Sequence, residues 1–91
     1  MGELGSFEKD PEAVLDYTVD WEAWLDGDTI YTSAWTVPTG ITKDSDSNTT
    51  TTATIWLSGG TAGELYKVKN HIVTAAGRED DRTINIHVVN K

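Results

Sequence analysis

Short runs in which apolar and polar residues alternate recur along this chain, and they constrain its fold more than any other feature. Residues 65–74 (LYKVKNHIVT) and 82–89 (RTINIHVV) both alternate over most of their length. Alternation with a period of two is typical of β-strands that bury one face. Similar runs are separated by turn residues at intervals of about ten positions, and this spacing predicts an all-β sandwich.

One of these runs, residues 10–25, admits two interpretations. Asp10 and Pro11 would suit the start of a helix. The alternation over residues 15–22 is cleaner and includes β-forming residues, so we predict a strand over 15–21, with Leu15 on its buried face, and then a turn or short helical bend at 21–26. The other predicted strands cover residues 29–37, 41–44, 49–57, 65–74 and 82–89, and a loop is predicted at residues 44–48.

The first residues of the chain show no periodicity. A chain of 91 residues is long enough for one domain, and we predict that this domain covers residues 13–91. Residues 1–12 are predicted to form an extended N-terminal arm outside the core, either disordered or docked on a neighbouring protein through Phe7. Neither a secretion signal nor a membrane span is predicted, because no long apolar run occurs.

The balance of charges and the residue types argue against several functions. Fifteen acidic and seven basic residues give a net charge of -8, which repels phosphate backbones and anionic lipids. We therefore expect no nucleic-acid partner and no membrane surface as partner. The sequence has no cysteine, no G-x-S-x-G motif and no histidine beside a candidate serine, so no catalytic residue and no enzymatic activity is predicted.

Two groups of residues have the types of metal ligands but lack their spacing. Residues 44–48 (DSDSN) begin like a calcium loop, but Thr49 and Ile55 stand where an EF-hand needs glycine and glutamate. His71 and His87 are the only histidines; they could come close together if their strands pair, but no further ligand accompanies them. We therefore predict no metal site and no cofactor.

Trp56 is the candidate binding residue that the alternation singles out. If Ala53, Ile55 and Leu57 face the core, Trp56 points outward from a threonine-lined strand. An exposed tryptophan on such a strand is typical of protein interfaces and of sugar-binding modules. The alternative is a register shift that buries Trp56. Trp24 is a second candidate for partner contact, with burial in the core as its alternative.

Tyr66 has the position of a known structural feature of immunoglobulin-like sandwiches. It opens the penultimate predicted strand shortly after Gly63. A tyrosine at this place forms a tyrosine corner, in which its hydroxyl bonds to the backbone across the corner between two strands. An ordinary core tyrosine is the alternative.

Four stretches of sequence, taken together, resemble a known family: LDYTVDWEAWLDGDTI, SAWTVPTG, TTTTATIWLSGGTAGELYKV and TAAGREDDRTINIHV. They are similar to small virion proteins of tailed phages that are described as fiber-tail adaptors, and the resemblance covers residues 9–90. It implies an immunoglobulin-like antiparallel β-sandwich of about six or seven strands. It also implies a non-enzymatic structural protein that binds other tail, fiber or capsid proteins and is present in several copies. Such a protein resides in the virion after synthesis in the host cytoplasm.

Other functions remain open from the sequence. A capsid decoration protein is one alternative within the same resemblance. A carbohydrate-binding surface module would use Trp56 and Trp24 as stacking platforms for sugar rings. A metal-dependent enzyme has only scattered carboxylates in its favour.

Overall fold

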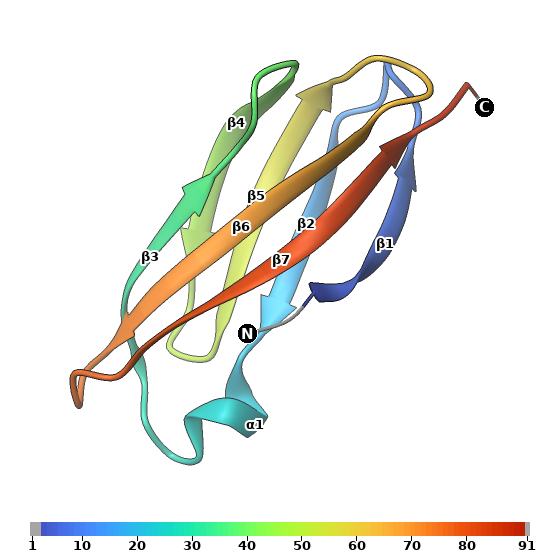
Figure 1. Ribbon diagram of the computed structural model, residues 1–91. Coiled ribbons are helices and arrows are strands. Elements are labelled where there is room, and N and C mark those ends of the chain that lie inside the picture. The colour runs from blue at the N-terminus through green and yellow to red at the C-terminus, as the bar shows by residue number, and fades with distance from the viewer. Residues whose placement is uncertain (1–2, 91) are drawn as a thin grey trace.

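The computed structural model describes the backbone of residues 3–90 and the side chains of residues 7–90. Within this range the chain forms seven β-strands and one helical turn, arranged as two layers (Figure 1). The elements in chain order are β1 (Glu3–Lys9), β2 (Leu15–Asp20), α1 (Glu22–Leu25), β3 (Ile30–Thr36), β4 (Ile41–Asn48), β5 (Thr52–Gly59), β6 (Leu65–Thr74) and β7 (Glu79–Val88).

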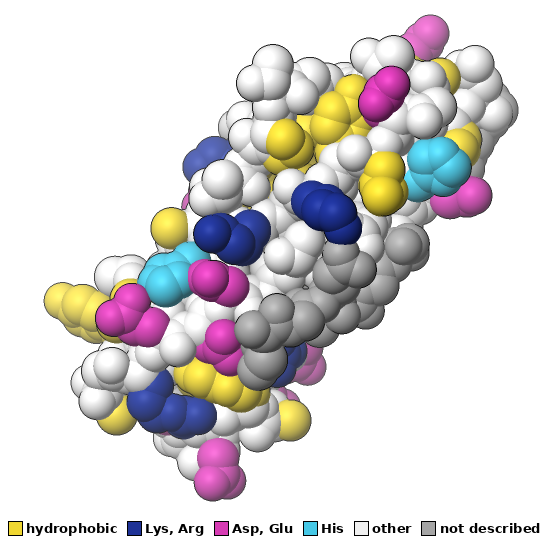
Figure 2. Space-filling view, in the orientation of Figure 1, with side chains coloured by type: hydrophobic (Ala, Val, Ile, Leu, Met, Phe, Trp, Pro, Cys, Tyr) yellow, Lys and Arg dark blue, Asp and Glu magenta, His cyan; other side chains and the backbone are white. Residues whose placement is uncertain are grey.

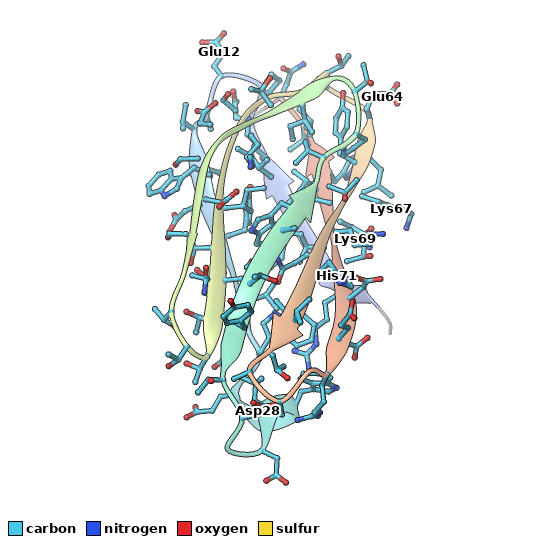
Figure 3. All side chains as sticks on the ribbon, turned by 90° about the vertical axis from the view of Figure 1, so that its left-hand side faces the viewer. Glu12, Asp28, Glu64, Lys67, Lys69 and His71 are labelled. Carbon is cyan, nitrogen blue, oxygen red and sulfur yellow. The ribbon has the colours of Figure 1, made fainter. Side chains whose placement is uncertain are left out.

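The strands form a four-stranded sheet with the order β1-β7-β6-β3 and a three-stranded sheet with the order β2-β5-β4. Every pair of neighbouring strands is antiparallel except β1 and β7, which are parallel. The two sheets lie face to face, and side chains from both fill the space between them (Figure 3). The predicted all-β sandwich with six or seven strands is confirmed.

The core follows the alternation that the sequence shows. On β5, Ala53, Ile55 and Leu57 are fully buried while the residues between them point away, because successive side chains of a strand face opposite sides of the sheet. The same holds on β6, and on β7 the apolar residues Ile84, Ile86 and Val88 are buried, although Asn85 between them is buried as well. Leu15 does not follow the prediction: it is 38% exposed, because β2 is an edge strand and its first residue lies at the rim of the sandwich.

Trp21 anchors one end of the sandwich. It directly follows β2, its side chain is fully buried, and its indole Nε1 donates a 2.9 Å hydrogen bond to Oδ1 of Asn70 on β6. A buried indole N–H needs such an acceptor, because an unpaired buried donor costs about 1–3 kcal/mol. The helical turn α1 starts next and closes this end, so the predicted short bend at residues 21–26 is confirmed.

Two arginines contact α1 and the tryptophan that precedes it. The Arg78 guanidinium lies 4.1 Å from the ring centre of Trp24 and donates 3.0 Å hydrogen bonds to the carbonyl oxygens of Trp24 and Leu25. Arg82 lies 4.3 Å from the ring centre of Trp21. These contacts pair carbonyls that the end of a helix leaves without partners, and they add cation–π attraction.

The N-terminal segment differs from the prediction. Residues 3–9 were expected to belong to an arm outside the core, but they form β1, which pairs with β7 at the edge of the four-stranded sheet. The side chain of Lys9 is fully buried, and its ammonium donates hydrogen bonds to the carbonyl oxygens of Gly59 (2.7 Å) and Asp10 (3.0 Å). Strand pairing uses only main-chain groups, so it does not require the alternation whose absence suggested an arm.

The predicted loop at residues 44–48 is also wrong. The backbone continues as β4 to Asn48 and pairs with β5. Only Ile41 of this strand is buried, because β4 is an edge strand and its polar side chains stay exposed. Lys43 and Asp46 form an ion pair of 2.6 Å along this edge. Charged side chains on an edge strand discourage pairing with another chain.

At the opposite end from α1, Tyr66 forms the predicted tyrosine corner. Its hydroxyl oxygen accepts a 2.9 Å hydrogen bond from the backbone N–H of Thr61. Glycines make this corner possible. Gly60 has a φ of +97°, and a Cβ placed there would lie 2.6 Å from Cγ2 of Val88. Val88 is fully buried and β-branched, so its side chain has little freedom to move away.

Replacing the neighbouring glycines tests this packing. Gly59 has a φ of +77° but no atom within 4 Å of an added Cβ, so Gly59→Ala is the matched control for backbone strain, which costs about 1–2 kcal/mol in either variant. We expect Gly60→Ala to lose a further 1–3 kcal/mol or so through overpacking against Val88. Urea unfolding measures the loss of unfolding free energy in both variants. Equal losses for the two variants would contradict the proposed contact.

Candidate partner-binding surfaces

The outer face of the three-stranded sheet carries an exposed tryptophan at its centre. β5 is the middle strand of this sheet, and Trp56 points away from the core with 41% of its surface exposed. Its neighbours along the strand, Ile55 and Leu57, are fully buried. The predicted orientation of Trp56 is therefore confirmed, and the register shift is excluded.

Polar side chains surround this tryptophan. Asp16 of β2 and Ser45 of β4 flank it as direct cross-strand neighbours. Further along, the hydroxyls of Thr18 and Thr54 lie 2.9 Å apart. We call this surface the Trp56 face and define it by Asp16, Thr18, Ser45, Thr54, Trp56 and Ser58.

Carboxylates give the Trp56 face its charge. Asp16 lies on it, Asp20 follows four positions later on the same side of β2, and Asp44 accepts a 2.8 Å hydrogen bond from the hydroxyl of Ser58. The outward positions of the described strands β2, β4 and β5 that pair around Trp56 hold no basic residue. The face is therefore acidic and rich in hydroxyl groups, with one large aromatic ring.

Phe7 lies elsewhere, at the seam where the edge strands β1 and β2 of the two sheets meet. Its ring centre is 5.2 Å from that of Tyr17, and 41% of its surface is exposed. The ring covers Tyr17, which is buried. Phe7 thus closes one long side of the sandwich and does not lie on the Trp56 face.

Trp24 lies at the end of the sandwich, in α1. It is partly buried between the edge of Trp21, with ring centres 5.3 Å apart, and the guanidinium of Arg78. These contacts account for its position in structural terms. The three residues predicted to bind a partner, Phe7, Trp24 and Trp56, are therefore spread over three parts of the molecule and do not form one site.

The outer face of the four-stranded sheet carries a mixture of charges (Figure 2). Lys67, Lys69 and His71 occupy alternate positions on β6, and their side chains point away from the sheet (Figure 3). His71 bonds through Nδ1 to Asp81 and through Nε2 to Glu79, the latter at 3.0 Å. The bond to Asp81 is the main cause that raises the pKa of His71 above its usual 6.5.

The two histidines do not approach each other as the sequence allowed. His71 pairs with Asp81, while His87 pairs with Leu65, six positions along the same ladder. That offset corresponds to about 20 Å. The carboxylates that contact His71 also sit on opposite ring nitrogens, so they do not converge on a point where a cation could bind.

Several kinds of site are missing from residues 3–90. No pocket is found there, and no group of three His, Cys, Asp or Glu side chains is placed to hold a metal ion. The helix in this part of the chain is too short to cross a membrane.

Sequence reasoning overlooked one exposed aromatic residue. Tyr31 on β3 is 74% exposed, the largest value among the large hydrophobic side chains. Tyr31 lies in a β-bulge between Ile30 and Thr32, and β3 itself is an edge strand of the four-stranded sheet. The sequence already indicates this exposure, because alternation that buries Ile30 places the side chain of Tyr31 outside.

The His71 contacts predict a pH-dependent term in stability. Because the folded pKa lies above 6.5, the stabilisation is fully present below about pH 6.5 and is lost as the pH rises through the folded pKa. We expect wild type to exceed His71→Gln in Tm by more at about pH 5.5 than at about pH 9. Thermal melts at both pH values measure this difference.

The variant Asp81→Asn provides the matched control, because it removes the main partner of the His71 imidazolium. It should therefore reduce the same pH-dependent contribution to Tm. A gap between wild type and His71→Gln that is constant with pH, or that widens at high pH, would contradict the assignment.

A known protein family is similar to this chain over most of its length. The family whose sequence model matches it is described as podophage GP4 fiber-tail adaptor protein gp77, and the match covers residues 9–87. It runs from the end of β1 almost to the end of β7 and includes Trp24 and Trp56, whereas Phe7 lies outside it. No curated protein matches the chain. The family has a structural role in the phage tail. Since the match spans most of the chain, this protein belongs to the podophage GP4 fiber-tail adaptor protein gp77 family.

Proposed function

We propose that this protein is an adaptor that joins a tail component to a fiber component by binding alone, and that the Trp56 face is one of its docking surfaces. The observation that carries the proposal is the exposed indole on the middle strand of the three-stranded sheet. Tryptophan is enriched among the residues that contribute most to protein interfaces, and such residues cluster near the interface centre. The family to which the chain belongs supports an adaptor role.

The chemistry of the Trp56 face supports a particular kind of partner. The carboxylates of Asp16, Asp20 and Asp44 favour a surface that presents lysine or arginine, because complementary charge steers association and excludes wrong partners. The indole of Trp56 requires an apolar recess in that surface. The partner is therefore a tail or fiber protein with basic residues around an apolar hollow.

The remaining expectations belong to the same proposal. We propose that the protein acts in several copies, without enzymatic activity, and that it is made in the host cytoplasm before it enters the virion. A net charge of -8 supports a protein partner over nucleic acid or a membrane. Phe7 and Trp24 stay predicted partner contacts, at surfaces separate from the Trp56 face; the exposed part of each ring is what a partner would cover.

A second candidate, carbohydrate binding, is favoured by one observation. Trp56 is surrounded by hydroxyls and a carboxylate from Thr54, Ser45 and Asp16, and sugars bind to such combinations of a stacking ring with hydrogen-bonding groups. A glycan array separates the two candidates, since an adaptor has no need to retain a sugar.

Trp56→Ala tests the proposed docking surface. The variant should stay folded, because the side chain lies outside the core. It should weaken binding to the purified tail or fiber partner by about thirtyfold, equivalent to about 2 kcal/mol, and lower incorporation into particles. Isothermal titration and quantification of the protein in purified virions measure the two effects.

Ile55→Ala is the matched control on the same strand. Ile55 is fully buried, so the variant should lose about 2–5 kcal/mol of unfolding free energy through the cavity it leaves. Once folded, it should bind with unchanged affinity. If Trp56→Ala enters virions at the wild-type level, the Trp56 face is not a docking surface.

A further inference from the structure

Each sheet of the sandwich ends in two strands, and no further strand within residues 3–90 pairs with their outer sides. These free edges are β1 and β3 in the four-stranded sheet and β2 and β4 in the three-stranded sheet. A free edge is a template for pairing with another chain, and proteins usually protect it with charged residues, proline or bulges.

Three of the four free edges carry such protection. β1 contains the exposed Glu8, β2 contains Asp16 and Asp20, and β4 contains two aspartates and a lysine. On each of these edges an incoming strand would meet carboxylates. A second copy of this chain would bring the same carboxylates with it, so like charges would face one another.

β3 is different, because its sequence IYTSAWT has no charged residue. The only irregularity is the bulge near its start, which leaves Thr32–Thr36 in regular pairing with β6. Thr32, Ala34 and Thr36 are exposed, and Tyr31 beside them is 74% exposed. Figure 3 looks at this side of the molecule, and β3 lies in front of β6 with no further strand of its own sheet beyond it.

We propose that β3 is a self-pairing edge, on which the β3 strand of a second copy adds in antiparallel orientation and joins two four-stranded sheets into one. The argument for a second copy is the match of the edge with itself: two uncharged strands meet without like-charge contact, and a two-fold axis near Ser33 sets Ala34 opposite Thr32 of the second copy. Tyr31 would then gain cover from the added strand. This proposal is independent of the Trp56 face, which lies on the other sheet.

The physics of this contact predicts weak association of the free protein. One added strand buries less than the ~1,200 Å² that stable interfaces typically bury. Each copy also carries a net charge of -8, which repels the other copy at low ionic strength. Salt screens that repulsion while it leaves main-chain hydrogen bonds in place, so association should strengthen with salt.

Sedimentation velocity of the full chain tests the proposal, at about 10–500 µM protein in about 0.05 M and 0.5 M NaCl. We expect a reversible monomer–dimer equilibrium that shifts toward dimer at the higher salt concentration. Ala34→Glu and Ala34→Lys should each weaken dimerisation at least tenfold, because like charges meet near the two-fold axis. An equimolar mixture of the two variants should restore it.

Leu65→Glu is the control, since it adds the same charge to an exposed position on β6, away from the edge. It should leave dimerisation unchanged. Thermal melts check that each variant is folded, and Thr32→Glu with Thr32→Lys is the reserve pair if the Ala34 variants unfold. A chain that stays monomeric under all these conditions, a mixture that fails to recover, or an equal loss in Leu65→Glu would each overturn the proposal.

Discussion

The hydrogen bond between the indole of Trp21 and the amide of Asn70 is the contact on which the two-sheet arrangement depends. Trp21 directly follows a strand of the three-stranded sheet and Asn70 lies on the four-stranded sheet, and both side chains are fully buried. Asn70 also donates to Ser33 Oγ at 3.0 Å and to the carbonyl oxygen of Ala34 at 3.1 Å. Apolar packing tolerates small shifts between sheets, whereas a buried amide with these partners fixes one position and also holds the edge strand β3.

The other end of the sandwich is fixed by different means and has a consequence for function. Lys9 reaches from the four-stranded sheet to the carbonyl of Gly59 on the three-stranded sheet, and burial lowers the pKa of its ammonium. With both ends held, β5 keeps its register, so Ile55 is buried in the core and Trp56 is exposed on the outer face. In the proposed function, folding and binding therefore use opposite faces of a single strand.

Alternation along the chain predicts much of this fold because it reports which face of a strand is buried. It places Trp56 outside, Ile55 inside and the short bend after Trp21, and turn residues locate Tyr66 at its corner. It fails where a strand has no buried face to report, as in residues 44–48, or where pairing rests on the main chain, as in β1. Contacts between distant segments, such as those of Arg78 with α1, leave no local pattern at all.

We propose that the acidic, tryptophan-centred face of the three-stranded sheet is where this family member meets another tail protein. A reconstruction of the intact phage tail at side-chain detail tests that claim most directly, because it shows every neighbour of this chain in the particle. We expect the reconstruction to show Trp56 in an apolar hollow of a different protein, with lysine or arginine side chains beside Asp16 and Asp20. A reconstruction in which Trp56 faces solvent in every copy would contradict the proposal.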